Sequence, residues 1–302
     1  MRRGLRRFSP DSEWFTALLF VGPVVVLWLW WFLIPLCKSI VYCFYDFNYA
    51  MPERTTFVGL DNFTKLFRDR YFWMAFEHSF QLVLVTVPVL MVLALALSIL
   101  LNQKFAARGL CRTVYFMPYV ISSVAVATVF MYLLVSDGFI PTFCARLFGM
   151  ANVSWFSDTR YALAGIMLMY VWQQVGFYMI LFLAGLQGIP EELREAAKID
   201  GANCIGEFIH VTVPCLLPTI FMNLIMAVIS SFKIFDQISA ISRNSVLGAP
   251  ANATSTIVTY FYVNAFRYGN VGYASASVVV LFAIIFALTL VQRIFETRLE
   301  AQ

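Results

Sequence analysis

The sequence is short of charged residues and lacks the motifs of common catalytic sites. Only 13% of its 302 residues are Asp, Glu, Lys or Arg, about half the share found in soluble domains. None of the 15 glycines is followed by Lys, which excludes the phosphate-binding P-loop, and neither a GxSxG elbow nor an HExxH helix occurs. The six cysteines form no CxxC pair, and His78 and His210 stand alone. We therefore expect no catalytic residue, bound metal or cofactor in this chain.

Apolar residues, in contrast, are abundant. Hydrophobic residues make up 61% of the chain, 30 residues are Phe, and the mean hydropathy is +0.78. Soluble domains hold about 45–50% apolar residues, and water does not tolerate so large an apolar surface. The composition predicts an integral membrane protein. The net charge of +4 is small, and no nucleic-acid partner is expected.

Six segments are long and apolar enough to cross a bilayer, whose core of about 30 Å needs about 20 helical residues. They predict an all-α protein with six transmembrane helices, and none of them contains an ionisable Asp, Glu, Lys, Arg or His. The first is too long an apolar run for a signal peptide, so we expect it to be retained. The segments are Phe15–Leu36, Phe80–Leu101, Thr113–Val135, Tyr161–Leu186, Cys215–Phe232 and Val271–Val291.

The distribution of Lys and Arg predicts which side faces the cytoplasm. One set of connections, together with both termini, holds eleven of the 21 basic residues at roughly twice the density of the other set. This set begins with Arg2, Arg3, Arg6 and Arg7. Both termini are therefore expected in the cytoplasm. The predicted parts are a basic segment 1–14, a six-span domain 15–291 with an external stretch 37–78, and a cytoplasmic tail 292–302.

The loop 187–213 between the fourth and fifth spans is too polar to cross the membrane, yet it has helical spacing. We call residues 189–214 the elbow, because the pattern predicts two short helices joined at a turn. Pro190 suits the first turn of a helix, where its missing N–H costs nothing. Gly201 permits the sharp turn between the two helices, and Pro214 is expected to end the second.

The first helix of the elbow has two different faces. On the polar face we expect two ion pairs with i,i+3 spacing, Glu191/Arg194 and Glu195/Lys198. The other face is narrow and consists of Leu193, Ala196 and Ala197. A helix lying on lipid would carry bulky apolar residues opposite Lys and Arg. An alanine face instead allows another protein to approach closely, so docking to a cytoplasmic partner is the favoured alternative.

The elbow resembles a known loop. Glu195-Ala196-Ala197, then Gly201, then Val211-x-Val213-Pro214 is similar to the Glu-Ala-Ala loop of binding-protein-dependent ABC-transporter permeases. Val211 and Val213 stand where Ile and Leu are more common in that family, a mild departure.

The flanking residues indicate the carbohydrate-uptake branch, and the pattern looks most like the first-type permease subunit of sugar and glycerol-phosphate importers. The resemblance extends over residues from about 15 to 295. It rests on Ile189-Pro190-Glu191-Glu192-Leu193, Ile199-Asp200-Gly201-Ala202, Phe57-Val-Gly-Leu-Asp-Asn-Phe63, Met117-Pro118-Tyr119, Thr256–Phe266 and Gly272-Tyr273-Ala274.

The resemblance implies the type I ABC importer permease fold in a bacterial cytoplasmic (inner) membrane. It further implies a second, different permease subunit, two copies of a cytoplasmic ATPase that bind the ATP-Mg, and an extracytoplasmic solute-binding protein that the stretch 37–78 helps to receive. The elbow would be the coupling helix. Glu195 would contact the ATPase, Ala196 and Ala197 would pack against it, and Gly201 would form the turn.

Polar residues at mid-membrane depth are candidates for the solute path. Amides, hydroxyls and aromatic rings suit a neutral polyol or sugar, but an intramembrane Gln or Asn often only bonds a neighbouring helix. A phosphorylated solute would need a cationic clamp, for which Lys233 and Arg267 are available, although Asp236 is expected to pair with Lys233. The candidates are Tyr119, Ser123, Tyr170, Gln173, Gln174, Tyr178, Asn223 and Ser230.

Two other classes of function stay open at this point. A stand-alone secondary transporter or channel would move solute without ATP, although proton-coupled transporters usually need intramembrane carboxylates. A membrane enzyme or assembly scaffold would need a catalytic or docking constellation that the sequence does not display. The cysteines on the external side, Cys37, Cys43 and Cys144, allow one disulfide, but packing as small apolar residues is the favoured alternative.

Overall fold

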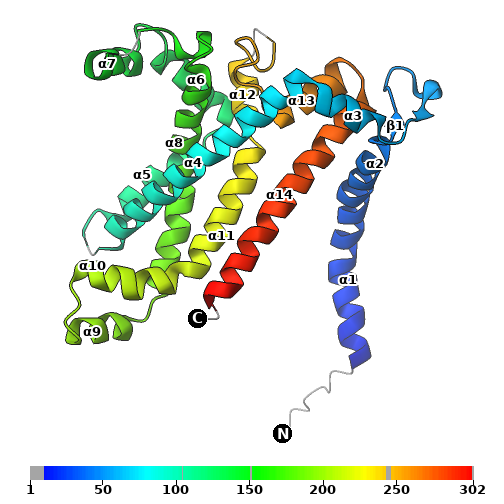
Figure 1. Cartoon of the computed structure of the whole chain (residues 1–302). Helices are drawn as coiled ribbons and strands as arrows, with labels where there is room; N and C mark the ends of the chain where they lie inside the picture. Colours follow the sequence, from blue (N-terminus) through cyan, green and yellow to red (C-terminus); the bar gives the residue numbers. More distant parts are fainter. Residues whose placement is uncertain (1–9, 104, 150–151, 243–245, 301–302) are drawn as a thin grey trace.

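The computed structural model describes residues 10–103, 105–149, 152–242 and 246–300, and it is almost entirely helical (Figure 1). In this part of the chain the only sheet pairs β1 (Tyr45–Asp46) with β2 (Thr56–Phe57), antiparallel. The predicted all-α fold class is confirmed. The four leading arginines and Lys104, which contribute to the predicted orientation, lie outside the described residues.

The predicted spans correspond to long helices. Five stretches of the described chain are long and apolar enough to cross a membrane, and a bent pair of helices gives a sixth if it is counted as one span. The five stretches are Trp14–Tyr42, Arg70–Asn102, Ala162–Gln187, Cys204–Ile241 and Val271–Thr297. The main helices within them are α1 (Pro10–Trp28), α2 (Ile34–Tyr42), α4 (Arg70–Asn102), α8 (Ala162–Gln187), α11 (Val213–Phe232) and α14 (Val271–Glu300).

Helices α4 and α8 form the centre of the bundle, and α11 packs on both of them and on α14. Half of the residues in the most apolar stretch of α8 are buried. Small residues allow the helices to approach closely, as is usual between helices in membranes. A Cβ added at Gly176 would overlap the Tyr115 carbonyl oxygen, and one added at Gly185 would lie 2.6 Å from the Thr219 hydroxyl oxygen. These contacts fix α8 against its neighbours.

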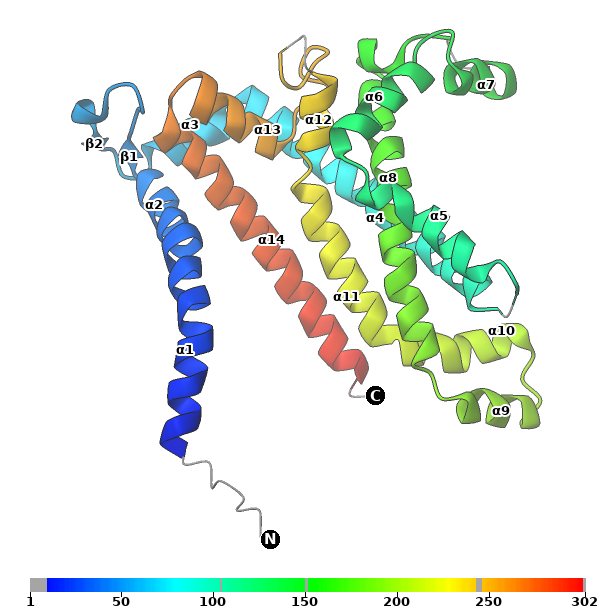
Figure 2. The same ribbon diagram turned by 180° about the vertical axis from the view of Figure 1, so that it is seen from behind.

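The first span is different, because it has almost no packing partner in this chain. No residue in the most apolar stretch of Trp14–Tyr42 is buried, and Trp31 is 75% exposed. A five-residue π-helix, η1 (Leu29–Leu33), lies between α1 and α2. Figures 1 and 2 show α1 standing apart from α14, with only the α2 end joining the bundle.

The third predicted span is not continuous, which corrects the expectation of one helix over Thr113–Val135. It consists of α5 (Arg108–Val120) and α6 (Ser123–Leu133), bent by 97°. Ile121 and Ser122 have extended backbone (ψ 139 and 132), and Pro118 removes a backbone donor one turn earlier. Breaks at membrane depth must have their backbone groups satisfied by neighbouring protein, and a polar side chain described below does so here.

Strands β1 and β2 form a hairpin at one end of the bundle. This end is held together by close contacts to the hairpin backbone from other segments. Asn62, on α3 (Asp61–Arg68), is buried and donates from Nδ2 to the carbonyls of Cys43 and Tyr45, both at 2.9 Å. Gly272, at the start of α14, lies so close to the hairpin that a Cβ would overlap the Tyr45 carbonyl oxygen. We call this whole end of the bundle, the one that carries the β1–β2 hairpin, the hairpin end.

Asp69 connects three helices at the hairpin end. As the N-cap of α4 it accepts a hydrogen bond from the backbone N–H of Tyr71 at 2.8 Å. Its other carboxylate oxygen accepts from the Tyr260 hydroxyl and, at 3.0 Å, from the Tyr273 hydroxyl. Burial and the hydrogen bond with Asp69 raise the pKa of the Tyr260 phenol.

The remaining short elements at the hairpin end are η2 (Pro52–Arg54), α7 (Phe139–Phe148), η3 (Trp155–Ser157), α12 (Asp236–Ile241), α13 (Ile257–Tyr262) and the π-helix η5 (Val263–Arg267).

The cysteines are unpaired. Of the three that sequence analysis placed outside, Cys43 is buried, Cys144 is partly buried and Cys37 is exposed. The described chain therefore contains no disulfide, and the alternative of cysteines acting as small apolar residues fits Cys43 best.

Candidate functional site

The elbow lies at the opposite end of the bundle from the hairpin, and its first helix is α9 (Glu191–Ile199) (Figure 1). Pro190 is the N-cap of α9 rather than its first residue, with extended backbone (ψ 132). Glu191 and Glu192 occupy the first turn and Lys198 the last turn, which matches the direction of the helix dipole. The predicted first helix of the elbow is confirmed.

The turn after α9 is built around Gly201, as predicted. Gly201 has φ +83, a conformation that glycine adopts without steric cost and that commonly follows a helix. The N–H of Asp200 donates to the Ala196 carbonyl, and the N–H of Ala202 donates to the Ala197 carbonyl, both at 2.9 Å. A Cβ on Gly201 would meet no atom within 4 Å. The requirement for glycine here is therefore conformational and not a matter of space.

The second helix of the elbow differs from the prediction at its end. It begins as α10 (Cys204–Glu207), capped by Asn203, whose side chain accepts from the Gly206 N–H at 2.7 Å. It then continues through a π-helix, η4 (Phe208–Thr212), directly into α11. Pro214 does not end a helix, because it lies in the first turn of α11, where a missing N–H is tolerated.

The expected ion pairs of the elbow do not form. In the part of the chain that the structure describes, the two ion pairs are Lys65–Asp61 and Arg194–Glu207. Arg194 reaches across the turn to Glu207, with its Nε 2.6 Å from Oε1, instead of pairing with Glu191. The buried Glu207 carboxylate is a stronger partner than an exposed one on the same helix, where a pair contributes only about 0.2–0.5 kcal/mol. Glu195/Lys198 and Lys233/Asp236 are also not ion pairs here.

No residue of α9 is buried within this chain. Glu195 and Ala196 are exposed and Ala197 is partly buried, while Leu193 is 46% and Ile199 86% exposed. A helix of nine residues with no buried side chain does not hold its place by packing. The alanine face predicted for docking is therefore available on the surface.

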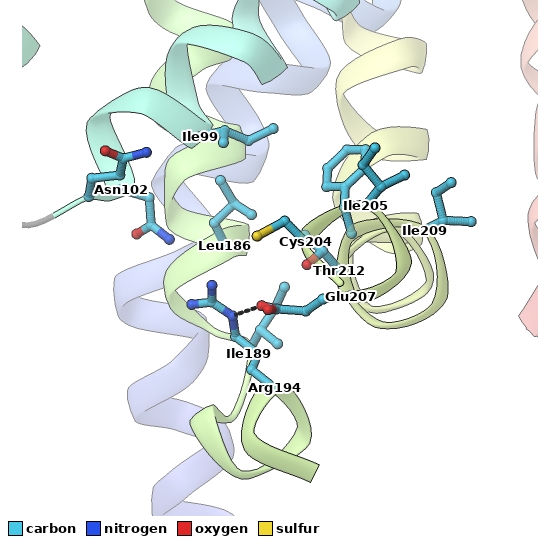
Figure 3. A pocket seen from close by; sticks show the side chains of 12 residues that line it. Ile99, Asn102, Leu186, Ile189, Arg194, Cys204, Ile205, Glu207, Ile209 and Thr212 are labelled. Carbon is cyan, nitrogen blue, oxygen red and sulfur yellow. Dashed lines mark hydrogen bonds and ion pairs between the residues drawn. The ribbon is translucent and has the colours of Figure 1, made fainter. Parts of the chain in front are cut away.

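A cavity of about 720 Å³ adjoins the inner side of the elbow. It is bounded by the end of α4, the end of α8 and the segment α10–η4, and Arg194 and Glu207 point toward one another at its wall (Figure 3). Apolar side chains such as Ile99 and Leu186 line its far side, and Asn102 adds a polar group.

Among the candidate path residues, Gln173 has a clear structural role. It is 3% exposed, and its Nε2 donates to the Ile121 carbonyl at 3.2 Å and to the Ser123 hydroxyl at 3.4 Å. Its Oε1 accepts from Nε2 of Gln237 at 2.9 Å. Gln173 therefore satisfies the backbone freed where the third span breaks. For this residue the alternative of a bond between helices fits better than a solute contact.

Tyr119 is the most accessible candidate. It is 38% exposed and stacks on Phe177, with ring centroids 4.6 Å apart. Gln174, Ser123 and Ser230 are partly buried. Aromatic rings, amides and hydroxyls are the groups predicted for a polyol or sugar surface, and the transport role of these residues stays a prediction.

The other candidates lie behind this surface. Tyr170, Tyr178 and Asn223 are at most 2% exposed. Tyr178 faces Ser230, and Tyr170 faces Ser231 without a hydrogen bond of normal geometry. Both amide atoms of Asn223 are buried with no hydrogen-bond partner among the described residues. The eight candidates thus separate into an accessible set and a buried set.

Sequence reasoning missed three polar residues that the structure makes important: Glu207, Gln237 and Asp69. Glu207 and Gln237 pair with residues far from them in sequence, so spacing gave no signal. Asp69 directly precedes a long apolar helix, and an N-cap signal was available there.

The comparisons with known proteins agree with this architecture. Residues 90–301 match the family described as "Binding-protein-dependent transport system inner membrane component". The chain belongs to this family. The resemblance drawn from the Glu-Ala-Ala motif is therefore confirmed, and the elbow carries that motif.

Relatives of this transport-system family align over most of their length. The lactose transport system permease protein LacF of Rhizobium radiobacter is 32% identical, covering 88% of this chain and 87% of the relative. The arabinooligosaccharides transport system permease protein AraP of Bacillus subtilis is 30% identical, covering 90% and 86%.

A solved structure shares the fold of this family member. It is a chain of a bacterial ABC transporter involved in the import of the acidic polysaccharide alginate, with a TM-score of 0.79 at 20% identity, covering 95% of this chain and 96% of that one. The predicted ABC importer permease fold is confirmed by this likeness.

Proposed function

We propose that this chain is one of two permease subunits of an ATP-driven importer for a sugar or polyol. It forms half of the translocation path, and ATP is hydrolysed by a separate cytoplasmic ATPase. The observation that carries the proposal is α9, an exposed helix that contains the Glu195-Ala196-Ala197 motif and has no buried residue. The proposed site is the bacterial cytoplasmic membrane, with both termini and the elbow inside.

The elbow supports an ATPase partner. Ala196 and Ala197 are small enough for close approach, and Leu193 and Ile199 leave apolar surface uncovered beside them. An apolar surface of this kind on a polar loop marks an interaction site. Docking of one ATPase subunit over α9 would cover it, and Glu195 would supply a polar contact at the rim.

The first span supports a second permease subunit. Trp28, Trp30 and Trp31 lie near the middle of Trp14–Tyr42 and are 53–75% exposed. Tryptophan prefers the two membrane–water interfaces over the hydrocarbon centre. Packing of the partner permease against α1 and η1 would place these rings against protein.

The relatives support the solute class and a binding protein. The two relatives described above are named as permease proteins of lactose and arabinooligosaccharide transport systems. A second structure with the same fold, TM-score 0.76, shows an alginate transporter in complex with a pentasaccharide-bound periplasmic protein. The Tyr119–Phe177 stack offers rings of the kind that pack on sugar C–H faces.

Reconstitution tests the proposal against a stand-alone transporter or channel. The tagged chain, purified from its native membrane in mild detergent, should retain a stoichiometric ATPase and a second permease. Proteoliposomes holding this complex and the cognate binding protein should accumulate labelled sugar only with ATP on the ATPase side. Uptake by the purified chain alone, without ATP, would instead support the stand-alone alternative.

Crosslinking provides the matched control. A photoreactive side chain at Ala197 should capture the ATPase. The same group at Ala145, on α7 at the hairpin end, should not.

A further inference from the structure

The ion pair between Arg194 and Glu207 is the strongest polar contact between the two helices of the elbow. The Arg194 Nε lies 2.6 Å from Glu207 Oε1, and the Glu207 side chain is only 10% exposed, against 43% for Arg194 (Figure 3). Within the described chain Glu207 has no other ion-pair partner. A carboxylate removed this far from water depends strongly on its partner.

The rest of the attachment of α9 is through two bends. Before α9 the chain passes through Pro190 in extended conformation, and after it through Gly201 in the left-handed conformation. No side chain of α9 is buried. Pro190 is exposed, and a Cβ on Gly201 would meet no atom within 4 Å. The ion pair therefore supplies a third point that fixes the angle between α9 and α10.

The cavity shows why a third point matters. About 720 Å³ of space adjoins the ion pair, between it and the ends of α4 and α8. A helix beside open space can tilt into it unless a contact prevents this. Arg194 and Glu207 form part of the wall of that space, at the side nearest α9.

We infer that Arg194 and Glu207 are positioning residues that lock α9 to α10. Motion of a docked ATPase then reaches α11 as one rigid displacement instead of being absorbed at the two bends. This inference rests on the proposed function, since it assigns the pair a role in coupling. In this role the two residues contact neither solute nor nucleotide. The ion pair transmits force and is not needed for the ATPase to bind.

The test compares neutral variants, an exchange of charges and a matched control in the reconstituted importer. Arg194→Gln and Glu207→Gln each break the ion pair with similar side-chain volume. R194E/E207R restores a pair in the opposite direction. Lys198→Gln removes one positive charge from the same helix, at an exposed residue outside any ion pair of the described chain.

The readouts separate coupling from assembly. Each single variant should retain the ATPase at wild-type stoichiometry while the sugar transported per ATP hydrolysed falls about tenfold, within the usual range of coupling effects. The exchange should restore at least half of that ratio, and Lys198→Gln should leave it unchanged. Wild-type ratios in both single variants would overturn the inference, as would an equal loss in Lys198→Gln.

A structural readout does not depend on activity. Spin labels at Ile199 and Ile209, both exposed, on a background without the six native cysteines, report the distance between the two helices. The distribution should broaden in Glu207→Gln and narrow again in R194E/E207R. An unchanged distribution in Glu207→Gln would overturn the inference. Absence of any ATPase from the wild-type complex would refute the proposed function itself, which is a separate result.

Discussion

The two ends of the bundle are held in different ways. At the hairpin end, Asp69, Asn62 and Gly272 join segments far apart in sequence through buried polar contacts and close backbone packing. At the elbow end, α9 has no buried side chain and is held by two bends and one ion pair. The hairpin end is thus fixed by contacts within this chain, while the elbow has few such contacts and, under the proposed function, is the part that a docked ATPase moves.

The largest effect is expected from crowding the hairpin end. Gly272→Ala places a Cβ onto the Tyr45 carbonyl oxygen and within 2.9 Å of the Phe47 nitrogen. Backbone must shift, at a cost of about 3 kcal/mol or more, at the upper end of overpacking effects. Folded yield in detergent and the unfolding temperature should both fall sharply. Gly22→Ala, with nothing within 4 Å, is the control; similar stability of the two variants would contradict the close packing seen here.

At the elbow, a change in backbone conformation should spare folding and strongly reduce transport. Gly201→Val must adopt a left-handed conformation, which costs about 1–2 kcal/mol, and the turn would rearrange. We expect normal membrane abundance with ATP-driven uptake reduced more than about tenfold. Gly201→Asn tolerates this conformation and should retain most activity. Normal uptake by the valine variant at normal abundance would count against the proposed coupling role of the elbow.

The break in the third span provides an intermediate test. Gln173→Leu leaves the Ile121 carbonyl and the Gln237 amide without their partner, which costs about 1–3 kcal/mol for a buried polar group. The unfolding temperature should fall accordingly. Gln174→Leu, at a partly buried residue in the same helix, should alter stability less and sugar uptake more. The reverse pattern would place Gln173, not Gln174, on the solute path.

A smaller loss is expected for Tyr260→Phe at the hairpin end. It removes one hydroxyl from Asp69, which keeps the Tyr273 hydroxyl and the Tyr71 N–H as donors. A hydrogen bond to a charged group contributes about 1.5–3 kcal/mol, and the remaining donors should limit the loss to the lower part of that range. The unfolding temperature should fall while sugar transported per ATP is unchanged. A changed transport ratio would mean that the hairpin end also takes part in coupling.

The smallest effect concerns the exposed pair Lys65–Asp61, with side chains 61% and 50% exposed. The hydrogen bond with Asp61 raises the pKa of Lys65. Stability from such a shift is fully present below the unfolded pKa of about 10.4 and is lost only as pH rises above it. Lys65→Ala should therefore cost about 0.5 kcal/mol or less, independent of pH between 6 and 9. A dependence on pH within that range would show that another group is involved.

The sequence predicted the features that depend on local pattern. Hydropathy located the spans, because an apolar helix of this length has no other stable environment. The turn at Gly201 was predicted correctly and the start of α9 to within one residue, because turn and capping preferences are set by a few neighbouring residues. The family resemblance was recognised from the Glu-Ala-Ala motif for the same reason.

The features that were missed depend on contacts between distant residues. The 97° bend after Val120 is stabilised by Gln173, about fifty positions later, and Gln173 is oriented in turn by Gln237. Arg194 had a suitable partner three residues away and selects another across the turn. Periodicity within one helix carries no information about such pairings, so sequence analysis left Gln173 between a solute contact and a bond between helices, and it gave Arg194 the wrong partner.

The π-helix η4 has a further geometric consequence. A π-turn accommodates one residue more than an α-turn, so closing η4 into regular α-helix would rotate everything before it by about 100° about the α11 axis and advance it by about 1.5 Å. Helix α9, which contains Arg194 and the alanine face, would rotate about the α11 axis together with α10. This single additional residue thus sets the direction in which the elbow points relative to α11.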